Sequence, residues 1–302
     1  MKPVLTDERF SDAGWLYERK LDGIRCLAVR DGPEVRLTSR NDLTLNGRYP
    51  ELVDALRRDR ARRFAVDGEV VAFAGAQTSF ARLGQRGRHP GIPVFLYVFD
   101  VLWLDGHDLR DLPLRIRKAV LRRTLRFRGP VRLTPYRYRE GEGFYRDACR
   151  RGWEGLIAKR ADSTYTSARS RDWLKFKCAS DQELVIGGYT APRGSREELG
   201  ALLLGHHRHG ELLYAGKVGT GFDREALREL GRRLRPLRRD SSPFADDDAP
   251  ARDATWVEPR LVAQVAFTEW TRDGRLRHPR YLGLREDKDP RDVVRERPRP
   301  AR

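Results

Sequence analysis

The chain has 302 residues, 39% of them hydrophobic, which is enough for real cores and suggests two domains. No apolar run approaches the length of a membrane span, and the first residues lack an apolar signal core, so neither membrane insertion nor export is indicated. The formal net charge of +17, from 61 basic against 44 acidic residues, favours a polyanionic partner, with nucleic acid first among the candidates.

The first part of the chain predicts mixed α and β structure with a largely antiparallel sheet. Apolar residues recur over positions 15–30 around a glycine turn, and Val35–Ser39 is typical of a partner strand. Further strands are expected at Phe64–Phe73, Val94–Leu104, Gly155–Lys159 and Trp173–Lys177. Helices are expected at Arg48–Arg58, Leu114–Leu125 and Gly143–Arg151.

The pattern changes after Cys178, where the short polar stretch Ser180–Gln182 is expected to link two domains, 1–179 and 180–302. The second region predicts strands at Glu183–Tyr189, Ala201–His206, Glu211–Val218 and Leu261–Trp270, and one helix at Arg224–Leu234. Short strands with a single helix suit a small oligonucleotide-binding β-barrel. Arg235–Arg252 is expected to be loop, and 291–302 a flexible tail.

The three cysteines, Cys26, Cys149 and Cys178, are odd in number and widely spaced. They predict neither a disulfide framework nor a zinc site, and they favour a reduced, intracellular compartment.

Lysine is rare, with eight residues against fifty-three arginines, yet six lysines fall in short segments that look like active-site motifs. Arginine is always charged, whereas a lysine amine can lose its proton and form a covalent bond. These six lysines are therefore candidates for chemistry: Lys20, Lys159, Lys175, Lys177, Lys217 and Lys288.

Seven segments follow one another in a fixed order: Lys20–Arg25 (of the form K-x-D-G-x-R), Ser39–Asn41, Asp67–Glu69, Phe99–Asp100, Glu154–Lys159, Trp173–Lys177 and Arg285–Lys288. In order and spacing they resemble the covalent nucleotidyltransferase superfamily, which comprises ATP-dependent DNA ligases, RNA ligases and mRNA capping enzymes. The segments 153–160, 185–189, 215–222 and 267–271 are most similar to the ligase module of bacterial end-joining DNA ligases.

The resemblance implies an α+β fold, with a nucleotidyltransferase (adenylation) domain of mostly antiparallel sheets at 1–179 and an OB-fold β-barrel after it. It implies an ATP-dependent DNA ligase that seals 3′-hydroxyl and 5′-phosphate ends through a lysyl-AMP and a DNA-adenylate, in DNA repair or end joining. The rival interpretations are an RNA ligase or capping-type guanylyltransferase, and a DNA-end-binding scaffold without catalytic activity.

Lys20 is the expected nucleophile for the α-phosphate of ATP. A lysine with a reference pKa of roughly 10.4 is mostly protonated at neutral pH, so nearby cations would have to favour the neutral amine. Lys159, Lys175 and Lys177 could supply those cations and neutralise phosphate oxygens. Asp22 could orient Lys20 or bind metal, or could simply shape the turn before Gly23.

The resemblance implies a role for each remaining motif residue. Glu18 would read the adenine amino group, Arg25 would contact the ribose, and Phe99 would stack on the purine unless it is a core residue. Glu69 and Glu154 would bind Mg²⁺ or Mn²⁺, with Glu69 also near the ribose. Arg40 would engage the DNA 5′-phosphate. Independently of the resemblance, Lys217 with Gly219 and Gly221 indicates backbone approach to a phosphate chain, or only a barrel turn. The motif that covers the pyrophosphate of ATP would comprise Arg285, Asp287 and Lys288, and its movement would need a hinge near Ser180–Gln182.

The expected partner is nicked or broken double-stranded DNA. Arginine clusters at residues 57–63, 115–123 and 232–239 fit phosphate contact, or could be ordinary solvated helix faces. By analogy, the end-binding protein Ku and separate polymerase and nuclease proteins could assist a monomeric, cytoplasmic and nucleoid-associated bacterial enzyme.

Overall fold

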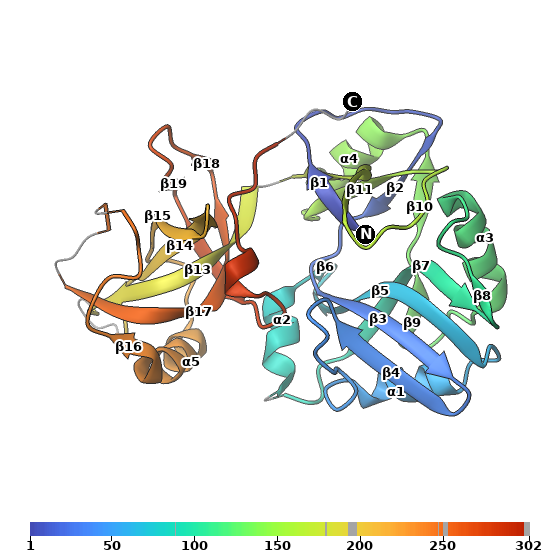
Figure 1. Cartoon of the computed structure of the whole chain (residues 1–302), viewed down its shortest axis with the longest axis horizontal. Helices are drawn as coiled ribbons and strands as arrows, with labels where there is room; N and C mark the ends of the chain where they lie inside the picture. Colours follow the sequence, from blue (N-terminus) through green and yellow to red (C-terminus); the bar gives the residue numbers. More distant parts are fainter. Residues whose placement is uncertain (88, 179, 193–197, 247, 250–252, 299–302) are drawn as a thin grey trace. The chain divides into compact units, whose positions relative to one another are not determined.

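The computed structural model describes residues 1–87, 89–178, 180–192, 198–246, 248–249 and 253–298 (Figure 1). The described residues divide into two compact units, Met1–Cys178 with Arg297 and Pro298, and residues 180–296. Among the described residues, strand pairs are antiparallel in both units, apart from two pairs in the first unit and one isolated parallel bridge in the second. The expected α+β class with mostly antiparallel sheets is therefore confirmed.

One sheet of the first unit has the strand order β1 (Lys2–Leu5), β12 (Arg169–Lys177), β11 (Gly155–Arg160), β2 (Trp15–Arg19) and β10 (Tyr136–Tyr138). Side chains alternate between its faces. One face buries Tyr17, Leu156 and Phe176 against helix α4 (Gly141–Arg150), so the neighbouring positions Glu18, Ile157 and Lys175 lie on the opposite face. The sequence did not predict β1, which pairs in parallel with β12.

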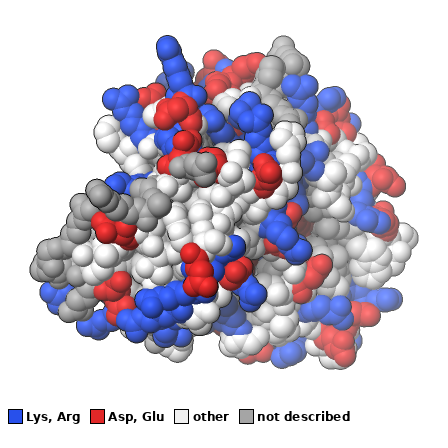
Figure 2. Space-filling model, turned by 60° about the vertical axis from the view of Figure 1, so that its left-hand side comes forward, with Lys and Arg blue, Asp and Glu red and all other residues white. Residues whose placement is uncertain are grey.

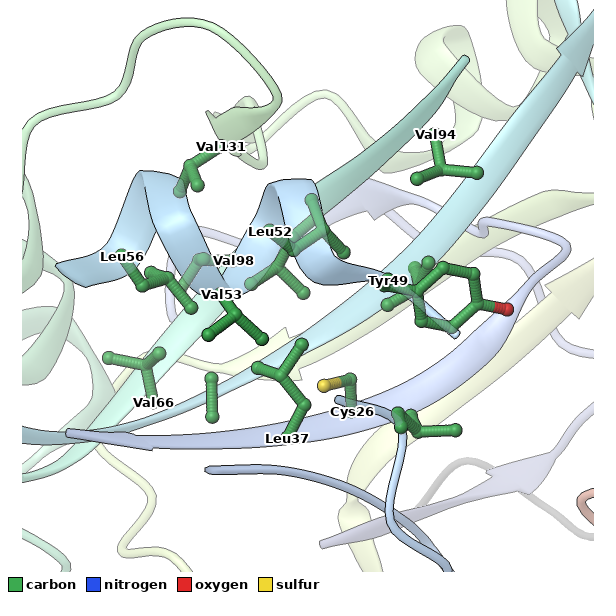
Figure 3. Close-up of a cluster of buried hydrophobic side chains, with 14 of the residues drawn as sticks. Cys26, Leu37, Tyr49, Leu52, Val53, Leu56, Val66, Val94, Val98 and Val131 are labelled. Carbon is green, nitrogen blue, oxygen red and sulfur yellow. The ribbon is translucent and has the colours of Figure 1, made fainter. Parts of the chain in front are cut away.

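The other sheet of this unit has the order β4 (Glu34–Ser39), β3 (Ile24–Asp31), β5 (Arg63–Ala74), β7 (Val94–Leu104) and β8 (His107–Asp108). Two short strands, β6 (Gln77–Thr78) and β9 (Val131–Leu133), pair with β5 and β7 respectively. Helix α1 (Pro50–Arg57) has proline in its first turn and covers one face, where Leu52, Val53 and Leu56 meet Cys26, Leu37 and Val66 (Figure 3). Short α2 (Phe80–Gly84), η1 (Gln85–Gly87) and the longer α3 (Leu114–Thr124) complete the unit.

The second unit is built on a six-stranded sheet of β13 (Ser180–Thr190), β14 (Leu202–Arg208), β15 (Glu211–Val218), β16 (Arg238–Arg239), β17 (Ala254–Phe267) and β20 (Arg280–Leu284). A hairpin of β18 (Glu269–Trp270) and β19 (Leu276–Arg277), helix α5 (Arg224–Leu234) and the turns η2 (Arg235–Leu237) and η3 (Pro290–Asp292) accompany it. Leu184 and Ile186 pack with α5 in one core, whereas Val185 joins Leu203 and Phe244 in another. Apolar side chains therefore cover both faces of the sheet.

Three expectations for the second unit need correction. Ser180–Gln182 is the beginning of β13 and not a separate polar link. Within the expected tail, Val294 and Glu296 bond to Gln182 through backbone groups at 3.0 Å each, so the described part up to Glu296 is held to the sheet. The expected loop 235–252 contains η2 and β16, while residues 247, 250–252 and 299–302 lie outside the described residues.

The expectation that the cysteines form no disulfide is wrong, because Cys149 and Cys178 are bonded across a sequence separation of 29 residues. Helix α4 packs on the sheet that contains β12, and this packing brings Cys149 close to the residue after that strand. Cys26 is free and buried in the core of the other sheet. In the part of the chain that the structure describes, no helix is long and apolar enough to cross a membrane.

Candidate active site

The polar face of the first sheet carries the expected lysines as a consequence of strand register. Glu18 lies opposite Ile157, which in turn lies opposite Lys175, and Gly155 lies opposite Lys177. Lys20 follows β2 directly, and its backbone N–H donates to the Gly155 carbonyl at 2.9 Å. Alternation therefore places the lysines of β11 and β12 on the face that Lys20 borders.

Lys20 and Glu154 form an ion pair between Nζ and Oε1, with each side chain 17% exposed. Glu154 precedes Gly155, whose φ is +144° and whose added Cβ would lie 1.9 Å from the Phe176 carbonyl oxygen. Only glycine allows β11 and β12 this close an approach. The structure thus brings together the expected nucleophile and one of the two expected metal ligands.

The second sheet contributes Arg25, which binds both Asp67 carboxylate oxygens at 2.5 Å. The Tyr165 hydroxyl donates to the same carboxylate at 2.8 Å. Burial alone would raise the pKa of Asp67, but the Arg25 charge and hydrogen bonds, the N-terminal amine and the Tyr165 hydroxyl together lower it. Half-buried Glu69 lies opposite Arg25 in the β3–β5 ladder. Asp67 was not expected as a site residue, although it lies in the Asp67–Glu69 motif.

Lys159 is 1% exposed and pairs with Glu18 Oε2 at 2.6 Å. Its ammonium also lies 4.1 Å from the Phe99 ring centroid and 3.9 Å from that of Trp173, both within cation–π range. Burial, opposed by Glu18 and reinforced by Lys118, lowers the pKa of Lys159 to about 8. Phe99 is itself buried, and the Arg25 guanidinium lies 4.7 Å from its ring centroid. Phe99 therefore contacts residues of both sheets.

Two cations of α3 have structural partners that the sequence analysis missed. Lys118 is buried and forms an ion pair with Glu18 Oε1. Arg117 was assigned to a surface cluster, and this was wrong, because it is 0% exposed and binds both Asp100 oxygens at 2.8 and 2.9 Å. The signal was present, since Leu114, Arg117, Lys118 and Leu121 have the spacing i, i+3, i+4, i+7 of a buried helix face.

Other expected residues of the first unit are more peripheral. Asp22 Oδ2 accepts the Phe80 N–H at 2.9 Å, and the Asp22 N–H donates to Thr78 Oγ1 at 3.1 Å. These bonds fit the structural alternative for Asp22, in which it shapes the turn. Arg40 is exposed in the turn after β4, while Lys175 is buried and Lys177 half-buried.

The expected residues of the second unit pair within that unit. The Arg285 guanidinium donates to both Asp287 oxygens at 2.8 and 2.9 Å. Lys288 forms an ion pair with Glu183 at 2.8 Å, and Lys217 is exposed on β15. The cations expected to meet the pyrophosphate of ATP are thus held by acidic side chains of their own unit.

Charge on the surface is mixed. On the face drawn in Figure 2, basic and acidic side chains lie beside one another. In the 232–239 cluster, Arg233 pairs with Glu229 at 3.1 Å and Arg235 with Glu198 at 2.6 Å. The arginines of residues 57–63 are all exposed, and two of them also have acidic partners, since Arg57 pairs with Asp54 and Arg63 with Asp31 at 3.0 Å each.

The carboxylates fit a divalent ion that shares its coordination with phosphate and water. Across the described ranges, no group of three or more His, Cys, Asp or Glu could hold a metal. Magnesium typically binds one or two carboxylates and completes its shell with water and substrate phosphates. Glu154, a carboxylate placed against the expected nucleophile, suits that arrangement.

Comparison with known proteins gives a consistent result along the chain. The model described as "ATP dependent DNA ligase domain" matches residues 5–177, and "ATP dependent DNA ligase C terminal region" matches residues 195–288. The multifunctional non-homologous end joining protein LigD of Pseudomonas aeruginosa is 41% identical over 94% of this chain and 35% of its own length. LigD of Mycobacterium tuberculosis is 42% identical over 93% of the chain and 37% of its own length. The chain therefore spans about a third of the length of these relatives.

Two solved structures support the same assignment. The mycobacterial DNA ligase D complexed with ATP and MES has a TM-score of 0.70 at 35% identity, with 98% of both chains covered. The ligase domain of M. tuberculosis LigD has a TM-score of 0.52 at 36% identity, again with 98% of both chains covered. The expected nucleotidyltransferase fold followed by an OB-fold is confirmed.

Proposed function

The chain belongs to the ATP-dependent DNA ligase family, and on that basis we propose that it seals 3′-hydroxyl and 5′-phosphate ends of duplex DNA through a lysyl-AMP intermediate. The observation that carries this proposal is the Lys20–Glu154 pair at the border of the lysine-bearing sheet face. A nucleophile, a carboxylate and several cations within one face are what transfer of a nucleotidyl group requires.

In the first step, Lys20 Nζ attacks the α-phosphorus of ATP. A P–N bond forms, the P–O bond to the β-phosphate breaks, the amine gives up a proton, and pyrophosphate leaves. Lys175 and Lys177 stabilise the negative charge that develops on the phosphate oxygens, since β12 directs both toward the reacting face. When bound at Glu154, a divalent cation would polarise phosphate oxygens and neutralise the carboxylate that otherwise stabilises the charged form of Lys20.

In the second step, an oxygen of the DNA 5′-phosphate attacks the AMP phosphorus and the P–N bond breaks, which restores Lys20. In the third step, the DNA 3′-hydroxyl attacks the activated 5′-phosphate, forms the phosphodiester and releases AMP. Arg40 is exposed and would engage the 5′-phosphate, and exposed Lys217 would contact the DNA backbone. Arg285, Asp287 and Lys288 would act on the pyrophosphate in the first step only.

The nucleotide site is proposed to lie between the two sheets of the first unit. Phe99 provides the purine-stacking ring, Arg25 and Glu69 line the ribose side, and Glu18 with Lys159 faces the base edge. The contacts of Phe99 support this assignment, because the residue proposed to contact the ribose, Arg25, and a residue proposed to face the base, Lys159, both lie near the Phe99 ring.

We further propose that double-strand breaks are substrates as well as nicks. The named relatives function in non-homologous end joining, but this chain matches only about a third of their length. Ku and separately encoded polymerase and nuclease activities would then assist the chain, which we expect to act as a monomer.

A sealing assay with nicked and double-strand-break DNA, with ATP, GTP or no nucleotide, tests the proposal. We expect ATP-dependent sealing that Lys20→Ala abolishes, while salt-sensitive DNA binding is retained. Sealing by Lys20→Ala would refute the assignment of the nucleophile, and DNA binding without sealing by the unmodified chain would favour the scaffold alternative. Preference for GTP or for RNA ends would favour the other nucleotidyltransferases.

A further inference from the structure

A buried group of three charges lies beside the proposed base pocket. Glu18 on β2, Lys118 on α3 and Lys159 on β11 are each at most 2% exposed. Lys118 binds Glu18 Oε1, and Lys159 binds Glu18 Oε2 at 2.6 Å. Each carboxylate oxygen therefore has its own ammonium partner, and the carboxylate is held from two sides.

Ion pairs to both oxygens of Glu18 restrict its carboxylate, whose orientation is otherwise weakly determined because the last side-chain torsion of glutamate is soft. Its distribution is broad and roughly two-fold, so backbone and rotamer preferences alone do not fix the plane of the carboxylate. With Lys159 as sole partner, the Glu18 carboxylate could turn about that contact. Lys118 removes this freedom, and its own position is fixed by α3 and by the Tyr136 ring, whose centroid lies 5.1 Å from Nζ.

The carboxylate in turn positions a cation at the proposed stacking ring. Lys159 Nζ lies close to the rings of Phe99 and Trp173, and Glu18 is the acidic partner that holds it there. The orientation of Glu18 thus affects both the acceptor presented to the base edge and the cation near the purine ring. Lys118 reaches Glu18 from helix α3, which lies outside the motif segments.

We propose that Lys118 is a positioning residue for base recognition, which orients Glu18 so that the site accepts adenine and disfavours guanine. This inference rests on the proposed function. A carboxylate oxygen accepts a hydrogen bond from the adenine amino group, whereas guanine presents a carbonyl acceptor at the same ring position and would face the carboxylate unfavourably. Discrimination of this kind requires a fixed acceptor, because a mobile carboxylate could turn away from the guanine carbonyl.

The test follows multiple-turnover sealing of nicked DNA by the full chain over a range of ATP and GTP concentrations, with the AMP adduct on Lys20 as a second readout. Lys118→Met keeps the length of the side chain but removes its charge. Loss of one hydrogen bond to a charged group, about 1.5–3 kcal/mol, corresponds to roughly a 10- to 140-fold effect. We expect the KM for ATP to rise and the preference for ATP over GTP to fall by about this factor, with little change in kcat.

Two controls separate positioning from general damage. Lys118→Arg retains a cation and should keep the low KM, and Arg128→Met removes an exposed cation just after α3 and should behave as the unmodified chain. Sealing of a saturating pre-adenylated nick, which needs no ATP, should proceed at the unmodified rate in Lys118→Met. Should Lys118→Met not fold, Lys118→Gln, which keeps a donor without charge, is judged by the same criteria.

An unchanged KM and an unchanged ATP preference in a folded Lys118 variant would overturn the inference. A fall in kcat with both substrates and with the pre-adenylated nick would also overturn it, because it would indicate only a structural role. If the unmodified chain itself formed no adduct on Lys20, the proposed function would fail, so the two failures are distinguishable.

Discussion

Replacing Gly155 by alanine should impair the proposed active site by displacing its backbone. The added Cβ would lie 1.9 Å from the Phe176 carbonyl oxygen, where at least 3.0 Å is needed, so β11 and β12 must separate by about 1 Å (3.0 − 1.9 = 1.1 Å). The Gly155 carbonyl accepts the Lys20 N–H at 2.9 Å, and Glu154 is the preceding residue. The displacement would therefore reach both members of the Lys20–Glu154 pair.

The structure gives the expected size of this effect. A misplacement of about 1 Å in a reacting group can reduce the rate roughly 100-fold. Alanine at a φ of +144° would add about 1–3 kcal/mol of backbone strain and lower the unfolding temperature. We expect both losses in Gly155→Ala.

The assay is single-turnover formation of the Lys20–AMP adduct at saturating ATP, together with thermal unfolding. Gly129→Ala is the matched control, since Gly129 also has a positive φ of +61° but its added Cβ would meet nothing within 4 Å. The control should lose about 1 kcal/mol of stability and no activity. Full activity and an unchanged unfolding temperature in Gly155→Ala would refute the steric reasoning.

Three further predictions concern buried charges and the cross-link. Asp100→Asn leaves the fully buried Arg117 without its counter-charge and should lower the free energy of unfolding, measured by urea titration, by about 3–5 kcal/mol. Adding Arg117→Met should restore part of the lost stability. An unchanged stability of Asp100→Asn would contradict the buried pair. Folding lowers the pKa of Lys159 from 10.5 to about 8, so between these pH values the unfolded chain binds more protons than the folded chain. The free energy of unfolding of the unmodified chain, measured relative to that of Lys159→Met, should therefore rise by about 3 kcal/mol from pH 8 to 10.5. A difference that does not change with pH would contradict the lowered pKa. The disulfide closes a loop with a sequence separation of 29, so its reduction should lower the free energy of unfolding of the unmodified chain by about 3–4 kcal/mol and leave that of Cys149→Ser unchanged. Equal stability of the unmodified chain with and without reductant would contradict the cross-link.

Local patterns predicted much of the fold. Helix α5 has the expected bounds Arg224–Leu234, because its apolar spacing is clear and Asp223 caps it by accepting the Ala226 N–H at 2.7 Å. The strands β7 and β15 also agree with the expected ranges. In these elements the period of apolar residues and the flanking polar residues indicate the same boundaries.

Features that depend on long-range pairing were not predictable in this way. The parallel strand β1 is short, and only its partner β12 makes it a strand. Cys149 and Cys178 meet because α4 packs on the sheet, which spacing along the chain does not reveal. The same holds for Lys118, which reaches Glu18 across a separation of 100 residues.

In the candidate site, too, local motifs were predictable from the sequence, whereas long-range contacts were not. Motif order predicted that Lys20 and Glu154 belong to one site, and in the structure the two side chains meet although they are 134 residues apart. Motif order did not predict that Lys20 and Glu154 form an ion pair, or that the Arg25 guanidinium binds Asp67. Motifs indicate which residue types the chemistry needs, whereas the pairing register of the strands determines which of these side chains are in contact.

Intact-protein mass spectrometry after incubation with ATP and magnesium tests the central claim most directly. The account predicts a mass increase of one AMP, mapped by peptide analysis to the Lys20 side chain and absent from Lys20→Ala. No adduct, or an adduct on another residue, would contradict it.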